Sequence, residues 1–268
     1  ETSGAKKLYA LYVSTIAQSD INHEELKKMA GDFLDEGSVD LAISLFAAYV
    51  DKLVDTHLGK DFIIREALEI IEAFVNTGWQ EGKDPFFAED LFAKIEQVYT
   101  SDAFEGVSQY KRAYNLEKMK EYEACVKEYI KLVNEFGDYQ YKDRIYFRLG
   151  IVSAYALHEI EQARTLLSKV IDDFKESQDY CNSAYHLGLL YQWEGKKENA
   201  LSYYHLILEK IKDAGEEREI VRLASDRIRE LEEKQDIEYN MRLFLDAALG
   251  PKKNIPSLQL DLFAKNAK

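Results

Sequence analysis

The chain has 268 residues, of which 46% are hydrophobic and 31% are charged, and its formal net charge is −14. This composition fits a globular protein that buries a sizeable core in one or two domains. The acidic balance argues against nucleic-acid binding and against docking on an anionic membrane, because both need a basic face. No apolar run reaches the roughly 18 residues that a membrane span requires.

Apolar residues recur at helical spacing through the first half of the chain. Gly37 suits a turn that reverses the chain between two helices, and Pro85 suits the first turn of a helix, because its missing N–H would be unpaired there. We interpret residues 77–85 as a long turn, which is more often a tolerated elongation than a contact loop. The helices expected here cover residues 5–18, 23–35, 38–55, 61–76 and a segment that begins at Pro85.

Three further helical pairs are expected in the second half, over residues 106–136, 143–174 and 181–212. Residues 216–247 then read as one long helix with a highly charged outer face. A stack of helical repeats must end in an element of this kind, so we expect it to cap the stack.

A repeated spacing of small residues connects the pairs. Two small residues stand twelve or thirteen positions apart in Ala30 and Ala42, Ala113 and Cys125, Gly150 and Ala163, and Gly188 and Ala200. The later pairs begin 37 and 38 residues apart. Because two helices approach closely only where side chains are short, a period of this length indicates stacked helix–turn–helix repeats. We therefore expect an all-α fold, an α-solenoid.

The segment from Ala184 to Ile207 resembles a tetratricopeptide repeat. Its residues at that family's signature positions are Leu187, Gly188, Tyr191, Gly195, Ala200, Tyr204 and Ile207. A second match near the N-terminus comprises Ala30, Phe33, Gly37, Ala42, Phe46 and Tyr49. The resemblance implies a right-handed superhelix of about five helix pairs that holds partner proteins or peptides in its concave groove.

The residue pattern and the resemblance together divide the chain into four parts. They are an N-terminal helix (1–22), the solenoid (23–212), a capping helix (213–249) and an extended tail or linker to a further domain (250–268). The later units are also similar to bacterial cell-envelope members of the family, of the outer-membrane assembly lipoprotein type. That similarity favours the cell envelope or periplasm, with the cytoplasm as the alternative, and leaves a membrane-anchored assembly open.

In the family, the residue after the packing position turns toward the concave side, and here those positions are rich in aromatic side chains. Tyr and Trp combine apolar area with a hydrogen-bonding tip and are enriched at binding surfaces. The expected partner-binding residues are Tyr110, Tyr114, Phe147, Ile151, Tyr155, Tyr185, Leu189 and Trp193. The other interpretation is that these stripes are core, covered by neighbouring repeats or by the helix over 216–247.

Motifs that carry catalysis are not evident in the sequence. The five histidines form no HExxH or paired-ligand spacing, no glycine-rich phosphate loop occurs, and no Ser or Cys stands in a nucleophile elbow. We expect His186 to be a partly exposed helix residue, and Cys125 to be a buried small hydrophobe. The sequence thus predicts no enzyme activity, no cofactor and no metal site.

Residues 251–268 break the helical pattern, and Leu258, Leu260 and Leu262 alternate as in a strand. The tail fits the first strand of a further domain, or an arm that pairs with a sheet edge or lies on the solenoid. A third interpretation is a ligand for the bacterial replication sliding clamp, whose binding peptide resembles Gln259, Leu260, Asp261, Leu262 and Phe263.

The predicted function is a non-catalytic scaffold or adaptor that binds a peptide or helix in its aromatic groove. Two alternatives stay open: a carrier or sensor for a small apolar ligand, associated with a transporter, and an adaptor that docks on the sliding clamp through the tail. The identity of the partner and the oligomeric state do not follow from the sequence.

Overall fold

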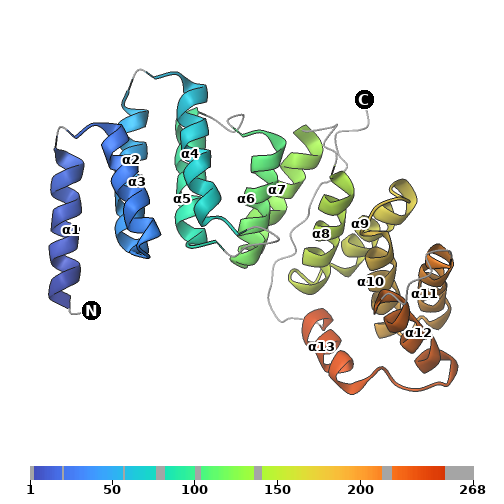
Figure 1. Cartoon of the computed structure of the whole chain (residues 1–268). Helices are drawn as coiled ribbons and strands as arrows, with labels where there is room; N and C mark the ends of the chain where they lie inside the picture. Colours follow the sequence, from blue (N-terminus) through green and yellow to red (C-terminus); the bar gives the residue numbers. More distant parts are fainter. Residues whose placement is uncertain are drawn as a thin grey trace. The chain divides into compact units, whose positions relative to one another are not determined.

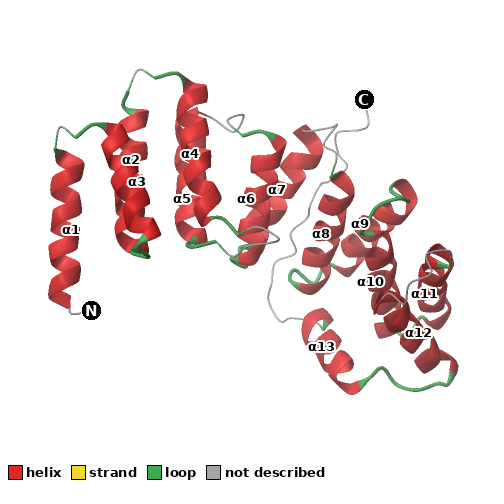
Figure 2. Cartoon of the chain, viewed as in Figure 1, coloured by secondary structure: helices red, strands yellow, loops and turns green. Residues whose placement is uncertain are grey.

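The computed structural model describes residues 3–19, 21–56, 58–76, 82–99, 104–135, 141–212 and 219–250. Every regular element in these ranges is an α-helix (Figure 2), so the all-α prediction is confirmed. The chain divides into two compact units, Glu1–Glu121 and Tyr122–Lys268, and each is described by itself. The tail motif over 259–263 lies outside the described residues, as do residues 77–81 of the expected long turn.

The first unit consists of helices that pack on their neighbours in the chain, from α2 on α3 through α5 on α6, while α1 packs on α3 (Figure 1). Its described helices are α1 (Ser3–Gln18), α2 (His23–Asp35), α3 (Val39–Val54), α4 (Lys60–Phe74), α5 (Pro85–Tyr99) and α6 (Gly106–Lys118). The expected helices between residues 5 and 76 are therefore confirmed within two residues at each end.

Local sequence explains where several of these helices begin and end. The Asn22 side chain accepts the Glu24 N–H at 3.1 Å and caps α2. Gly37 takes a φ of 80° in the turn after α2, a conformation that favours glycine. Asp84 accepts the N–H groups of the second and third residues of α5, both at 3.0 Å, and Pro85 opens that helix as expected.

The second unit is a series of helices in which α7 packs on α8, α8 on α9, α9 on α10, α10 on α11 and α11 on α12. Its described helices are α7 (Tyr122–Glu135), α8 (Lys142–Tyr155), α9 (Ile160–Asp173), α10 (Tyr180–Trp193), α11 (Lys197–Ile211), α12 (Glu219–Glu232) and α13 (Tyr239–Leu249). None of the described helices in either unit is long and apolar enough to cross a membrane.

Glycines allow two of these helix pairs to pack closely. A Cβ atom added to Gly150 would lie 2.7 Å from the side chain of Leu167 on α9. One added to Gly188 would overlap the ring of Tyr204 on α11, which is fully buried. The prediction that these glycines lie where the second helix crosses is confirmed.

The expected single capping helix within 213–249 is instead two helices, α12 and α13. The interruption contains Lys234 with a φ of 55°, outside the helical region, and Ile237, whose side chain is buried. The Glu238 carboxylate then accepts the backbone N–H groups of Asn240 and Met241, two and three residues on, and so caps a new helix. The break therefore arises from a buried apolar anchor followed by a cap.

Candidate functional site

Partly exposed side chains from α8 and α10 meet on one surface of the second unit, which we call the aromatic face. On α8, Phe147, Ile151 and Tyr155 lie four residues apart and are each partly exposed. On α10, His186 and Trp193 lie seven residues apart and so share one side of that helix. The His186 ring centroid is 6.0 Å from that of Phe147 and 5.4 Å from that of Tyr155. The two helices therefore form one surface.

His186 and Tyr155 form a neutral hydrogen-bonded pair within this face. The Tyr155 hydroxyl and His186 Nδ1 share a hydrogen bond of 2.8 Å. Burial lowers the pKa of His186 to about 4 and raises the pKa of the Tyr155 hydroxyl, so both groups are uncharged at pH 7. The pair thus adds hydrogen-bonding capacity to an apolar surface without adding charge.

Two of the expected contact residues lie in the core. Tyr185 is 7% exposed and Leu189 is 2% exposed, and the Tyr185 ring lies 5.8 Å from that of Tyr204. Helix α10 packs against α9, α11 and α12, which leaves only a narrow side open. That side carries His186 and Trp193. Tyr185 and Leu189 are core residues, which a partner cannot reach.

Tyr110 and Tyr114 belong to α6 in the first unit. Their rings stack with centroids 6.4 Å apart and planes 21° apart, and Lys118 Nζ lies 5.3 Å from the centroid of the Tyr114 ring. Both tyrosines are partly exposed, as expected for a surface stripe. Of the eight expected residues, Phe147, Ile151 and Tyr155 share one side of α8, and α13 contacts both Tyr155 and Trp193.

Helix α13 lies against the aromatic face and packs on α8. The Phe244 ring lies 5.6 Å from that of Tyr155, and the Trp193 indole N–H donates to Asp246 Oδ1 at 2.9 Å. Leu245 on the same helix is fully buried in the core of the unit. The sequence left open that the helix expected over 216–247 covers these stripes, and the part that does so is α13, a helix separate from α12.

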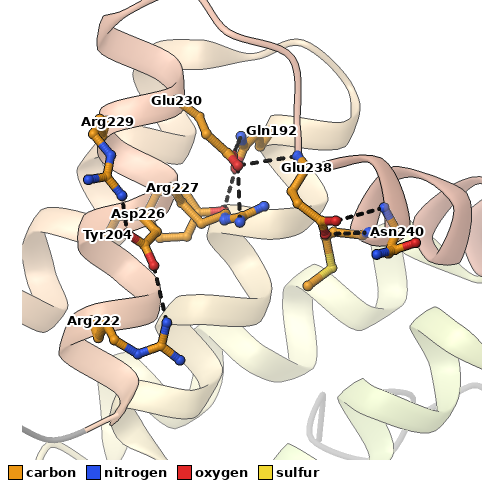
Figure 3. A network of polar contacts seen from close by, with 10 residues as sticks. Gln192, Tyr204, Arg222, Asp226, Arg227, Arg229, Glu230, Glu238 and Asn240 are labelled. Atoms are coloured by element: carbon orange, nitrogen blue, oxygen red, sulfur yellow. Dashed lines mark hydrogen bonds and ion pairs between the residues drawn. The ribbon is translucent and has the colours of Figure 1, made fainter.

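A buried polar network holds the start of α13 (Figure 3). The Tyr204 hydroxyl donates to Gln192 Oε1 at 2.8 Å, and Gln192 Nε2 donates to Glu230 Oε2 at 3.2 Å. Glu230 Oε1 pairs with Arg227 Nη2 at 3.0 Å and also accepts the backbone N–H of Glu238 at 3.2 Å. The Glu230 carboxylate thereby connects α10, α11 and α12 to the residue that caps α13.

A surface pocket of about 590 Å³ lies elsewhere in the second unit, at the end of α9. Its lining is largely acidic and comprises Asp143, Asp172, Asp173, Phe174, Lys175, Glu176 and Ser177. Across the described ranges, no group of three or more His, Cys, Asp or Glu side chains is placed to hold a metal ion. The aromatic face is therefore the stronger candidate site.

No protein-family model matches this sequence, and a comparison with curated proteins finds no match either. The function is consequently argued from the aromatic face and the helices that carry it.

Proposed function

We propose that this chain is a tetratricopeptide-type α-solenoid that serves as a non-catalytic scaffold, and that its aromatic face holds a helix or peptide of a partner protein. The regular packing of consecutive helices supports the solenoid. The glycines at the α8–α9 and α10–α11 crossings support the tetratricopeptide assignment, because the family's small residues are expected at those positions.

The exposure of the aromatic face is the observation that carries the proposal. The packing sides of α8 and α10 carry other residues, since Leu149 and Leu187 are fully buried. Phe147, Tyr155 and Trp193 nevertheless remain partly exposed on neighbouring helices. Contiguous exposed aromatic side chains are characteristic of interaction sites.

The polar groups of the face suit a polypeptide ligand. The Trp193 indole N–H is a donor, and it already holds a carboxylate of α13. The neutral Tyr155–His186 pair lies among apolar rings, next to Phe147 and Phe244. Such a surface buries apolar side chains of a ligand and offers hydrogen bonds to its polar groups, as binding sites for helices commonly do.

Site-specific photo-crosslinking in the source cells tests the proposal. With p-benzoyl-phenylalanine in place of Phe147, we expect a covalent adduct of one discrete partner. The matched control carries the same group at Tyr203, a partly exposed aromatic residue on α11. The partner should then be lost from pull-downs with the Tyr155→Ala, Trp193→Ala double variant.

Two results would contradict the proposal. One is the same set of adducts at positions 147 and 203, which would indicate non-specific contact. The other is unchanged partner recovery with the double variant while its helical circular dichroism stays intact.

A further inference from the structure

Helix α13 has the fewest buried residues of the described helices in the second unit. Leu245 and Leu249 are its buried positions, whereas Tyr239, Leu243 and Phe244 are 72%, 50% and 53% exposed. By contrast, α10 buries nine residues. Because burial of apolar area is the main term that holds a helix in place, α13 is the helix most easily detached from this unit.

The contacts of α13 with the aromatic face are those of a bound ligand. Phe244 packs on Tyr155, and Asp246 accepts the Trp193 N–H. Hydrogen bonds from Trp193 and from Arg242 lower the pKa of Asp246, so this carboxylate is ionised at neutral pH. An aromatic side chain of α13 thus contacts Tyr155, and a carboxylate two residues later binds Trp193.

The connection to α12 allows α13 to leave without disturbing the rest of the unit. The connecting residues 233–236 are all exposed, and the chain re-enters the core at Ile237. Glu230 holds the backbone N–H of Glu238, so the connection has a fixed point directly before α13 (Figure 3). Motion of the helix about that point costs the contacts of Phe244, Leu245, Asp246 and Leu249, and leaves α12 in place.

We propose that α13 is a built-in occupant of the aromatic face and that a partner helix must displace it. This inference rests on the proposed function. The partner is then an amphipathic helix with the chemistry of α13: an aromatic residue, a leucine next to it, a carboxylate two residues on and a leucine five residues on. A tethered occupant competes at an effective concentration near the millimolar range, so it weakens binding of the free helix.

The test uses the full chain and a substitution that unfolds α13 alone. Leu243→Pro removes a helical N–H at an exposed position in the middle of this short helix, and its ring clashes with the preceding turn, so the helix is broken there. Leu243→Ala removes the same apolar side chain and keeps the helix, so it is the matched control. The probe is a fluorescein-labelled synthetic peptide of residues 237–250 with the natural sequence.

We expect the Leu243→Pro chain to bind this peptide about tenfold more tightly than either the wild-type chain or the Leu243→Ala chain. Adding Trp193→Ala to Leu243→Pro should remove that gain. The double variant Phe244→Ala, Asp246→Asn changes only exposed side chains of α13, and it should raise the peptide affinity by a smaller factor.

The inference is overturned if the peptide binds all of these chains equally, or if neither Leu243→Pro nor the Phe244→Ala, Asp246→Asn variant binds it more tightly than wild type. Failure of the proposed function looks different: the peptide binds the opened chain, but crosslinking at position 147 finds no partner. If crosslinking succeeds and the peptide affinity does not change, the face binds a partner and α13 does not regulate it.

Discussion

The two units solve the packing of neighbouring helices with different residues. In the first unit, Ala30 and Ala42 lie at a crossing, and phenylalanine rings meet edge to face, as Phe74 and Phe87 do at 4.9 Å. In the second unit, Gly188 lies against Tyr204, a fully buried ring whose hydroxyl donates to Gln192. An apolar ring can shift within its pocket, whereas a hydrogen-bonded tyrosine cannot shift without losing its partner. The first unit also has such a ring, Tyr49, whose hydroxyl donates to Glu66 Oε2 at 2.6 Å, but the small residue of α2 at the crossing is alanine and not glycine. The α10–α11 crossing, which has no room for a Cβ atom at Gly188, should therefore tolerate fewer changes.

A second contrast is between two buried arginines, Arg112 and Arg227. Arg164 of the second unit resembles Arg112, since it also pairs with two carboxylates, Glu161 and Glu194. Arg112 of the first unit pairs with two carboxylates, since its Nη2 lies 2.7 Å from Glu89 and its Nη1 lies 2.9 Å from Glu96. Among the described residues of the second unit, Arg227 pairs with Glu230, a carboxylate that also connects to Gln192 and Glu238. The second arrangement concentrates several contacts on one side chain, which makes it the more sensitive of the two.

Substitution of Glu230 should have the largest effect. Glu230→Ala leaves Arg227 buried with an uncompensated charge, and we expect the second unit to lose about 3–5 kcal/mol of unfolding free energy. The matched change in the first unit, Glu96→Ala, leaves Glu89 on Arg112 and should cost about 1 kcal/mol. Urea unfolding of both variants measures the difference. Equal losses would remove the contrast between the units.

Acid should weaken the contact between α8 and α10 through His186. Burial lowers the folded-state pKa of His186 to about 4, below the unfolded value of 6.5, so protonation favours the unfolded state. Its contribution is complete above pH 6.5 and is lost as the pH falls toward 4, by about 3 kcal/mol at most. An NMR titration of the His186 ring measures this pKa directly. A value near 6.5 would show that the ring is solvated.

Alanine at Gly188 should be nearly as damaging. The added Cβ overlaps the Tyr204 ring, and we expect a net loss of about 2–3 kcal/mol even after the gain in helix propensity. Tryptophan fluorescence during urea unfolding reports this loss. Trp79, the other tryptophan of the chain, is replaced by phenylalanine in both proteins, so that the signal comes from Trp193. A stable Gly188→Ala protein with native spectra would mean that the crossing is looser than described.

Alanine at Gly31 is the matched change in the first unit and should have the smallest effect, of opposite sign. Gly31 lies within α2, and a Cβ added there meets no atom within 4 Å. Because glycine is a poor helix former, Gly31→Ala should stabilise α2 by about 0.5–1 kcal/mol. Slower hydrogen exchange of the α2 amides would confirm it, and a destabilised protein would show that α2 has a neighbour at this position.

Most helices could be predicted from the sequence because their limits are local. Apolar spacing, Asn22, Gly37 and Pro85 act within a few residues of the chain. The break between α12 and α13 could not be predicted in the same way, since no Gly or Pro interrupts residues 233–238. That break depends on Glu230 and on the burial of Ile237, which are tertiary contacts.

The candidate site could be predicted in part. Phe147, Tyr155 and Trp193 follow from helical spacing, but Tyr185 and Leu189 are buried because α10 packs against three helices. The role of His186 depends on rings contributed by another helix, α8, which no local pattern reveals. Its spacing of seven residues from Trp193 was the one available signal.

Native-state hydrogen exchange on the unmodified chain measures how readily α13 detaches from the aromatic face. We expect the α13 amides to exchange through a local opening whose free energy is several kcal/mol below that of α10, and the Trp193 indole N–H to become exchangeable in the same event. Exchange of α13 and α10 with equal protection would contradict this expectation.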